Sequence, residues 1–161
     1  MPTILKEKHF DKYVIYFDGA CGSISEDDNL ATFGFTVSKN NVLVHEGWGV
    51  VGVGRDVTNN VAEFGALIKA LEYLRQQPIT GEVYVYGDSK LVINQVKLRW
   101  RVLKPHLVPL VNYARALSEG LYIYFQHVPR ERNVMADALS KRAYKAFKLG
   151  YDGARIQTET F

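Results

Sequence analysis

The sequence predicts one α/β domain in which a five-stranded mixed β-sheet is flanked by helices. Residues 13–51 contain three stretches of strand-forming residues separated by turn signals, and strand and helix patterns alternate over residues 60–148. Strands joined by short turns are typical of an antiparallel meander, whereas strand–helix–strand units add parallel strands. We therefore expect three antiparallel strands followed by two parallel ones.

Periodicity and turn residues place the individual elements. Asp18-Gly19 is a turn signal, so a loop rich in Gly, Ser, Asp and Asn should run from there to about Asn29, and Asn40-Asn41 is typical of a tight hairpin turn. Residues 150–161 carry no strong signal. The expected strands are Tyr13–Phe17, Ala31–Ser38, Val42–Val51, Glu82–Tyr86 and Gly120–His127. The expected helices are Asn60–Gln77, Ser89–Leu98, His106–Ser118 and Asn133–Lys148.

Length and composition fit a single intracellular domain. The chain has 161 residues, of which 47% are hydrophobic and 23% charged, as in ordinary globular proteins. No apolar run approaches the about 20 residues of a membrane span, and Met1–Lys12 lacks the apolar core of a signal peptide. The single cysteine, Cys21, can form neither an internal disulfide nor a cysteine zinc site by itself. We expect a cytoplasmic protein with a core over about 13–148, a tail over 149–161, no membrane contact and no obligate protein partner.

Basic residues gather in two stretches, although the net charge is only +3. Both stretches would suit phosphate contacts, but charge alone favours two solvated helix faces. The first stretch surrounds Trp100 and comprises Lys90, Lys97, Arg99, Arg101 and Lys104. The second comprises Arg130, Arg132, Lys141, Arg142, Lys145 and Lys148.

Three acidic residues have ordinary structural explanations when each is taken alone. Asp18 precedes a glycine in a predicted turn, and Asp88 stands where it could cap the next helix. Asp137 lies in the first turn of the last predicted helix, where the helix dipole favours a negative charge.

Glu63 is more informative. It shares a helix face with Leu67, Ala70 and Leu74, which should be the buried side. A buried carboxylate costs several kcal/mol unless something compensates it, and a bound cation would do so. A capping box, with Asn60 as N-cap and Glu63 reaching back to it, explains the residue equally well.

The four acids together favour a metal site. Asp18 and Asp88 follow predicted parallel strands, whose carboxyl ends gather at one rim of the sheet. The other two acids stand at the start of helices that would pack against this sheet. Four carboxylates in one place would repel each other strongly, and hard divalent cations such as Mg²⁺ or Mn²⁺ remove that repulsion. Two such ions are a recurring device for phosphodiester cleavage.

Four segments resemble the signature blocks of type 1 ribonuclease H and occur in the same order. These are Tyr16–Cys21 (YFDGAC), Asn59–Glu63 (NNVAE), Tyr86–Lys90 (YGDSK) and Asn133–Ser140 (NVMADALS). The resemblance spans roughly residues 13–148 and implies a ribonuclease H-like fold. It also implies an endonuclease that cleaves the RNA strand of RNA–DNA hybrids, leaving 5′-phosphates, with two Mg²⁺ or Mn²⁺ ions; double-stranded RNA stays open as a further substrate.

The resemblance also assigns residues. It makes Asp18, Glu63, Asp88 and Asp137 the metal ligands and catalytic acids. It places Asn59 and Asn60, with the backbone near Cys21 and Gly22, against the minor groove of the hybrid, where 2′-hydroxyls distinguish RNA from DNA. For the two asparagines, helix capping is the alternative, and one of them should cap. Within the same blocks, the expected substrate contacts include Gly19, Ser89 and Lys90.

Two departures from the family pattern affect the site. Many bacterial members carry a histidine in a flexible loop before the last aspartate, whereas His127 should lie on a strand and be structural. Arg130 instead resembles the arginine of an archaeal-like branch that lacks this histidine; it cannot act as a base but could bind phosphate or help to expel product. The second departure is a compact segment in place of a longer basic handle, where Arg99, Trp100 and Lys104 are expected to contact the DNA strand; the alternative is a Trp100 that anchors a helix corner.

Three other functions are open at this stage. The chain could be a nucleic-acid-binding module without catalysis, although clustered acids would not help a protein that only binds phosphates. It could be another nuclease or transferase of the same superfamily, such as a resolvase or integrase. A metal-binding structural protein is the third alternative, and the basic Trp100 region argues against it.

Overall fold

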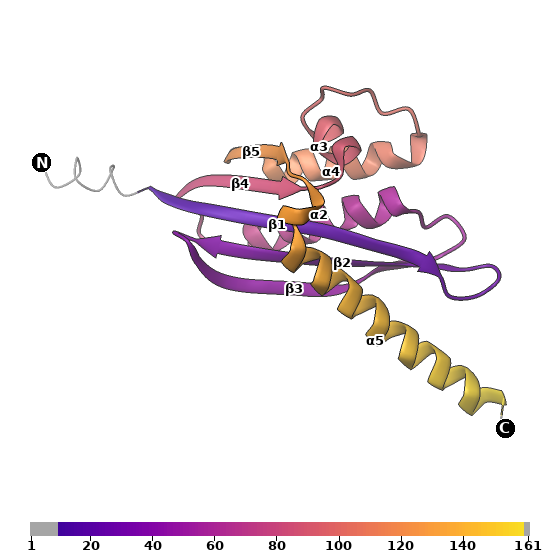
Figure 1. Cartoon of the computed structure of the whole chain (residues 1–161). Helices are drawn as coiled ribbons and strands as arrows, with labels where there is room; N and C mark the ends of the chain where they lie inside the picture. The colour runs from indigo at the N-terminus through magenta and orange to yellow at the C-terminus, as the bar shows by residue number, and fades with distance from the viewer. Residues whose placement is uncertain (1–9, 160–161) are drawn as a thin grey trace, which may run out of the picture.

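The computed structural model describes residues 10–159, with side chains through Asp152. Its sheet has the order β3-β2-β1-β4-β5 (Figure 1). β1 pairs antiparallel with β2, β2 antiparallel with β3, and β4 parallel with both β1 and β5. The strands are β1 (Asp11–Ser23), β2 (Asn29–Lys39), β3 (Val42–Gly54), β4 (Gly81–Gly87) and β5 (Tyr122–His127). The predicted α/β class and mixed five-stranded sheet are confirmed.

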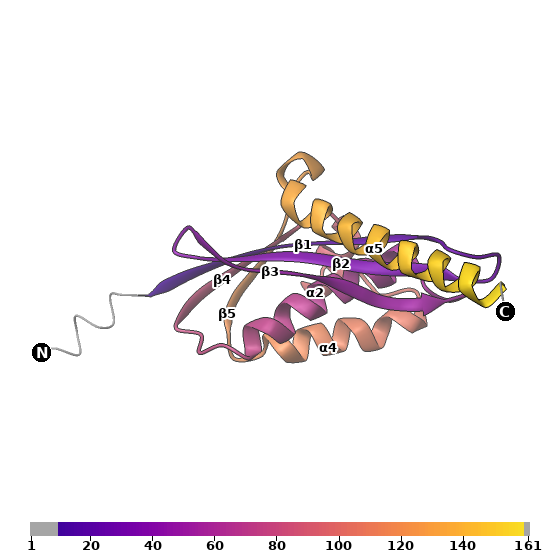
Figure 2. The same ribbon diagram turned by 90° about the horizontal axis from the view of Figure 1, so that it is seen from below.

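The helices cover both faces of the sheet (Figure 2). α2 packs on β1 and β2 and against α4 on one face, whereas α5 packs on β2, β1 and β3 on the other. The helices are α2 (Asn59–Arg75), α3 (Lys90–Val96), α4 (Val108–Ser118) and α5 (Val134–Glu159), with short 3-10 turns η1 (Pro105–Leu107) and η2 (Arg130–Arg132). Within the described residues, no helix is long and apolar enough to cross a membrane.

The main core lies between the sheet and α2. Ile15 and Phe17 of β1 are completely buried, as are Phe64, Leu67 and Leu71 of α2. Their spacing of two on the strand and three or four on the helix is the pattern that predicted both elements. This core holds the middle of β1 against the N-terminal part of α2, which is where Asp18 and Glu63 lie.

Glycine allows α5 to approach the opposite face closely. A Cβ on Gly34 of β2 would lie 2.5 Å from the carbonyl oxygen of Ala136 and 2.5 Å from the amide nitrogen of Ser140. Nearby, the buried Thr32 hydroxyl donates to the Ser140 carbonyl at 2.7 Å. The register of α5 on the sheet, and with it the position of Asp137, therefore depends on these contacts.

The Asn40-Asn41 hairpin turn is confirmed, because both residues adopt positive φ angles of 52° and 67°. The loop expected to begin at Asp18-Gly19 is wrong. β1 continues through both residues and pairs with β2 as far as Ser23 opposite Asn29. Residues with turn propensity are held in the strand there because β2 satisfies their backbone hydrogen bonds.

The expected asparagine cap, two capping alternatives left open by the sequence and the expected end of the last helix do not hold. Thr58 caps α2, accepting from the amide of Val61 at 3.3 Å, so neither asparagine is the N-cap and the capping box does not form. Ser89, not Asp88, caps α3. α5 continues to Glu159, through residues in which the sequence carries no strong signal.

Candidate metal and nucleic-acid site

Three carboxylates meet at one rim of the sheet. Asp18, Glu63 and Asp88 each offer an oxygen within 4.8 Å of the others. The parallel pairing of β1 with β4 ends at Phe17 opposite Gly87, so the next residue on each strand is an acid. Adjacent parallel strands therefore deliver two of the three carboxylates to the same rim.

The third carboxylate, Glu63, comes from the N-terminal part of α2, which lies directly against β1. A Cβ on Gly19 would lie 2.4 Å from the carbonyl carbon of Ala62 and 2.7 Å from the amide nitrogen of Glu63. Only glycine allows this contact without displacing the helix. The glycine after Asp18 thus sets the distance between the strand acid and the helix acid.

The negative charges of the carboxylates are strongly disfavoured at this site unless a cation is bound. Burial raises the pKa of Asp18 to about 7, opposed by hydrogen bonding to Glu63 and reinforced by the charges of Asp88 and Asp137. Burial, followed by the charge of Asp18, raises the pKa of Glu63 well above its ordinary value. Among the described residues, Glu63 Oε2 is buried and has no hydrogen-bond partner. This oxygen-only, partly unpartnered donor set fits a divalent cation.

Asp137 lies beside this cluster but outside the three-carboxylate group. Its Oδ2 pairs with Lys141 Nζ at 2.9 Å, one helical turn further along α5. Its charge nevertheless contributes to the raised pKa of Asp18, so the two carboxylates are near neighbours. The structure brings all four predicted acids to one rim, with the last one held by a lysine.

Asn133 joins β1 to the start of α5, a role that its sequence context does not predict. It is buried, its Nδ2 donates to the Phe17 carbonyl at 2.8 Å, and its backbone carbonyl accepts from the Asp137 amide at 3.1 Å. This one residue therefore ties the position before Asp18 to the start of α5. Its place at the front of the last motif was the only signal in the sequence.

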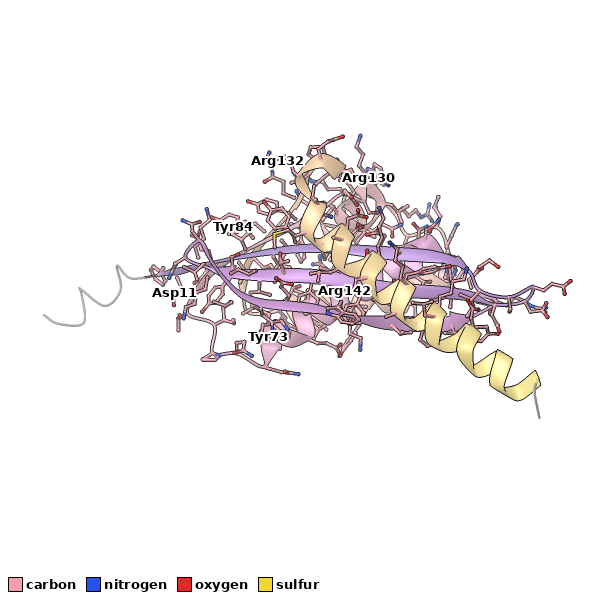
Figure 3. The ribbon with its side chains drawn as sticks, turned by 60° about the horizontal axis from the view of Figure 1, so that its bottom comes forward. Asp11, Tyr73, Tyr84, Arg130, Arg132 and Arg142 are labelled. Atoms are coloured by element: carbon pink, nitrogen blue, oxygen red, sulfur yellow. The ribbon has the colours of Figure 1, made fainter. Side chains whose placement is uncertain are left out.

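The segment between β5 and α5 is short. His127 is the last residue of β5, opposite Gly87, so its placement on a strand is confirmed. Arg130 is exposed in η2, and Figure 3 shows Arg130 and Arg132 together beside the beginning of α5. The arginine, unlike the histidine, stands on a solvent-facing turn where it can reach a phosphate.

A groove of about 490 Å³ joins the start of α2 to the basic stretch around Trp100. Its walls include Asn60, Arg99, Trp100 and Lys104, all of which are predicted substrate contacts. Gln95 also lines the groove; it is 3% exposed, and its Oε1 has no partner among the described residues. This amide was missed because one glutamine on a short helix carries no distinctive pattern.

The remaining predicted contacts surround this arrangement. Asn59 and Lys90 are exposed, whereas Ser89 is occupied in capping α3. The thiol of Cys21 is half-buried and contacts the Val57 carbonyl at 3.8 Å, which fits a packing role for its sulfur.

Comparison with known proteins identifies the family. The family described as Reverse transcriptase-like matches residues 17–143. The crystal structure of RNase H1 from Halobacterium salinarum superposes with a TM-score of 0.73 at 34% identity, covering 84% of this chain and 98% of that one. The chain belongs to the type 1 ribonuclease H family. The LC11-RNase H1 structure in complex with RNA/DNA hybrid gives a TM-score of 0.71 at 31% identity, covering 84% of this chain and 99% of that one.

Longer relatives contain this ribonuclease H unit as a part. The bifunctional protein Rv2228c of Mycobacterium tuberculosis is 43% identical over 95 residues, which are 58% of this chain and 26% of that protein. The chain thus spans about a quarter of the length of this curated relative. The match to ribonuclease HI of H. salinarum, 36% identical, covers 80% of this chain and 62% of that protein.

Proposed function

We propose that the protein hydrolyses the RNA strand of RNA–DNA hybrids to give 5′-phosphate ends. The observation that carries this proposal is the convergence of Asp18, Glu63 and Asp88 within 4.8 Å, in a chain 34% identical to an RNase H1 over most of its length. The solved complex of LC11-RNase H1 with an RNA/DNA hybrid supports the same substrate class. A buried carboxylate oxygen without a partner serves no purpose in a protein that only binds phosphates.

The acids would hold two Mg²⁺ or Mn²⁺ ions, with Asp137 completing the ligand set. Such ions lower the pKa of bound water and stabilise negative charge on the phosphate and the leaving oxygen. Asp18 and Glu63 are positioned through the Gly19 contact, so the metal site is fixed in the folded chain before substrate arrives. Lys141 pairs with Asp137 from the next turn of the same helix.

The other predicted residues bind and orient the hybrid. Asn59 and Asn60 would hydrogen-bond sugar and base edges in the minor groove, where the 2′-hydroxyl marks the RNA strand. Arg99, Trp100 and Lys104 would hold the DNA strand in the groove that also contains Asn60. Arg130 would contact the phosphate near the cleavage point and assist product release.

The test is cleavage of matched RNA–DNA, RNA–RNA and DNA–DNA duplexes with Mg²⁺, with Mn²⁺ and with a chelator. We expect metal-dependent cutting of the RNA strand in the hybrid; cutting of RNA–RNA would add double-stranded RNA as a substrate. Binding without cleavage would reveal a binding module, and preferential cutting of DNA would indicate a resolvase- or integrase-like enzyme. Either result would overturn the proposal.

A further inference from the structure

One half of a sheet face carries a row of tyrosines. α5 packs on β2, β1 and β3, and the same face of β1, β4 and β5 continues beyond that helix. In the parallel registers Tyr16 lies opposite Tyr86, and Tyr84 lies opposite Tyr124. Tyr122 belongs to the same face, because side chains two residues apart on a strand point the same way. The tyrosine row consists of Tyr16, Tyr84, Tyr86, Tyr122 and Tyr124.

The rings form ordered pairs across the strands. Tyr16 and Tyr86 have ring centroids 5.2 Å apart, and Tyr84 and Tyr124 are stacked at 5.2 Å. On the other side of Tyr84, Lys12 Nζ lies 5.0 Å from the ring centroid. Tyr124 is 49% exposed and Tyr122 is 70% exposed, so the β5 end of the row presents aromatic surface to solvent.

The tyrosine row is continuous with the acid site. Tyr16 stands two residues before Asp18 on β1, and Tyr86 stands two residues before Asp88 at the end of β4. Successive ring pairs therefore follow the strands away from the carboxylates in steps of about 6.6–6.8 Å. The RNA backbone must pass these carboxylates if it is cut there.

Charge favours nucleic acid at the acid-site end of the row. Figure 3 shows Arg130 and Arg132 on the same side of the molecule as Tyr84, near the beginning of α5. Both arginines are exposed and stand between β5 and α5. At the far end the charge is mixed, because Glu82 accepts from the Tyr84 hydroxyl while Lys12 covers its ring.

We propose that the tyrosine row binds single-stranded RNA that extends from the hybrid duplex. Aromatic faces stack on bases without requiring a particular sequence, and arginines beside them contact the phosphates. The site would hold the unpaired part of an RNA strand whose paired part lies at the carboxylates. This inference rests on the proposed cleavage of hybrids, because that reaction brings the RNA strand to the start of the row.

The test compares a short blunt hybrid with the same hybrid carrying a single-stranded RNA extension at its 5′ or its 3′ end. Binding is measured by fluorescence anisotropy with a chelator, and cleavage as kcat/KM with Mg²⁺. An extension lacking bases separates stacking from phosphate contacts. Tyr122→Ala/Tyr124→Ala removes the exposed rings, Tyr122→Phe/Tyr124→Phe keeps them, and Tyr113→Ala removes a 45% exposed tyrosine on α4 as a matched control.

We expect one of the two extensions to tighten binding by the unchanged protein at least about fivefold, the effect of stacking one base on an aromatic ring. The gain should disappear in the double alanine variant and with the base-free extension, and persist in the double phenylalanine and Tyr113→Ala variants. The inference would be overturned if neither extension tightened binding, or if the double alanine variant gained as much as the unchanged protein. It would also be overturned if the double alanine substitution changed only the oligomeric state of the protein and the extension had no effect. Cleavage of the blunt hybrid reports on the proposed function separately, because it should be the same in all these proteins.

Discussion

At the scale of single residues, Glu63 shows how position decides what a carboxylate can do. Its spacing from Leu67, Ala70 and Leu74 predicted a buried side, and all three of those residues are buried. The sequence left a capping box open, and the structure excludes it because Thr58 caps α2. With that role removed, an acid with an unpartnered buried oxygen beside Asp18 is best explained by a cation.

Asp18→Asn should abolish cleavage and stabilise the metal-free protein. The substitution removes a metal ligand and a buried charge that Asp88 and Asp137 disfavour. Because folding raises the pKa of Asp18 from 3.8 to about 7, the native state binds more protons between these values, and wild-type stability falls as the pH rises through them. The advantage of the variant should thus be absent below pH 3.8 and reach on the order of 4 kcal/mol above pH 7.

Thermal melting in a chelator across this pH range measures the stability effect. Asp27→Asn is the matched control, because Asp27 is 71% exposed and pairs with Arg55 at the surface. Substantial activity of Asp18→Asn at several metal concentrations would remove Asp18 from the ligand set.

Arg130→Ala should lose more activity than His127→Ala. Arg130 is exposed on η2, seven residues before Asp137, whereas His127 ends β5 and is half-buried beside Gly87. We expect roughly a tenfold or greater fall in kcat/KM for the arginine variant, typical of removing a charge-assisted hydrogen bond to phosphate, and a small change for the histidine variant. The reverse order in steady-state kinetics would make His127 the functional residue.

At the scale of elements, the sequence predicted which segments are strands and helices better than where they end. Asn59–Arg75 was recognised because burial imposes a helical period on its apolar residues, and Val42–Gly54 because strand-forming residues follow the Asn40-Asn41 turn. β1 was cut short at Asp18-Gly19 because turn propensity is local, whereas the strand is extended by pairing with β2. The end of α5 was missed because its last turns lack an apolar stripe that would mark a packed helix.

The same distinction applies to the site. The four acids could be predicted because each is part of a sequence motif, and the strand order then places two of them at one rim. Asn133 and Gln95 could not be predicted, because only the fold brings them to the site. Asn133 donates to the Phe17 carbonyl, and Gln95 lines the groove.

Gly34→Ala should destabilise the protein and reduce activity together. The new methyl group would meet backbone atoms of Ala136 and Ser140 at 2.5 Å, so α5 must move away from β2 and carry Asp137 with it. We expect a loss of about 1–3 kcal/mol in the free energy of unfolding, the usual cost of overpacking.

Gly52→Ala on β3 is the matched control for this helix contact. The nearest atom to its new methyl group is Val57 Cγ2 at 3.8 Å, an ordinary contact, so stability and activity should change little. Urea unfolding and hybrid cleavage measured on both variants decide the matter; equal stability of the two would show that α5 adjusts without cost.

At the scale of the whole molecule, three surfaces converge on the carboxylate rim. The groove with Asn60 and Trp100 lies on the α2 and α3 side, and the tyrosine row leads away along β1 and β4. The α5 helix with Asp137 and Arg142 covers the remaining part of the sheet (Figure 3). Under the proposed function, a duplex is gripped on one side of the rim while metal ions held by the acids contact the RNA phosphate.

This arrangement predicts how binding depends on salt. Arg99 and Lys104 line the groove with Trp100, away from the carboxylates, so they should contribute to affinity through DNA-strand phosphates and leave the chemical step little changed. In Arg99→Ala/Lys104→Ala the slope of log K against log salt should flatten by up to about 1.8, at about 0.9 for each phosphate that the protein no longer neutralises. Lys145→Ala/Lys148→Ala removes two exposed charges from α5 and is the matched control. If only this control flattens the slope, the C-terminal basic residues hold the hybrid and the groove around Trp100 is a solvated face.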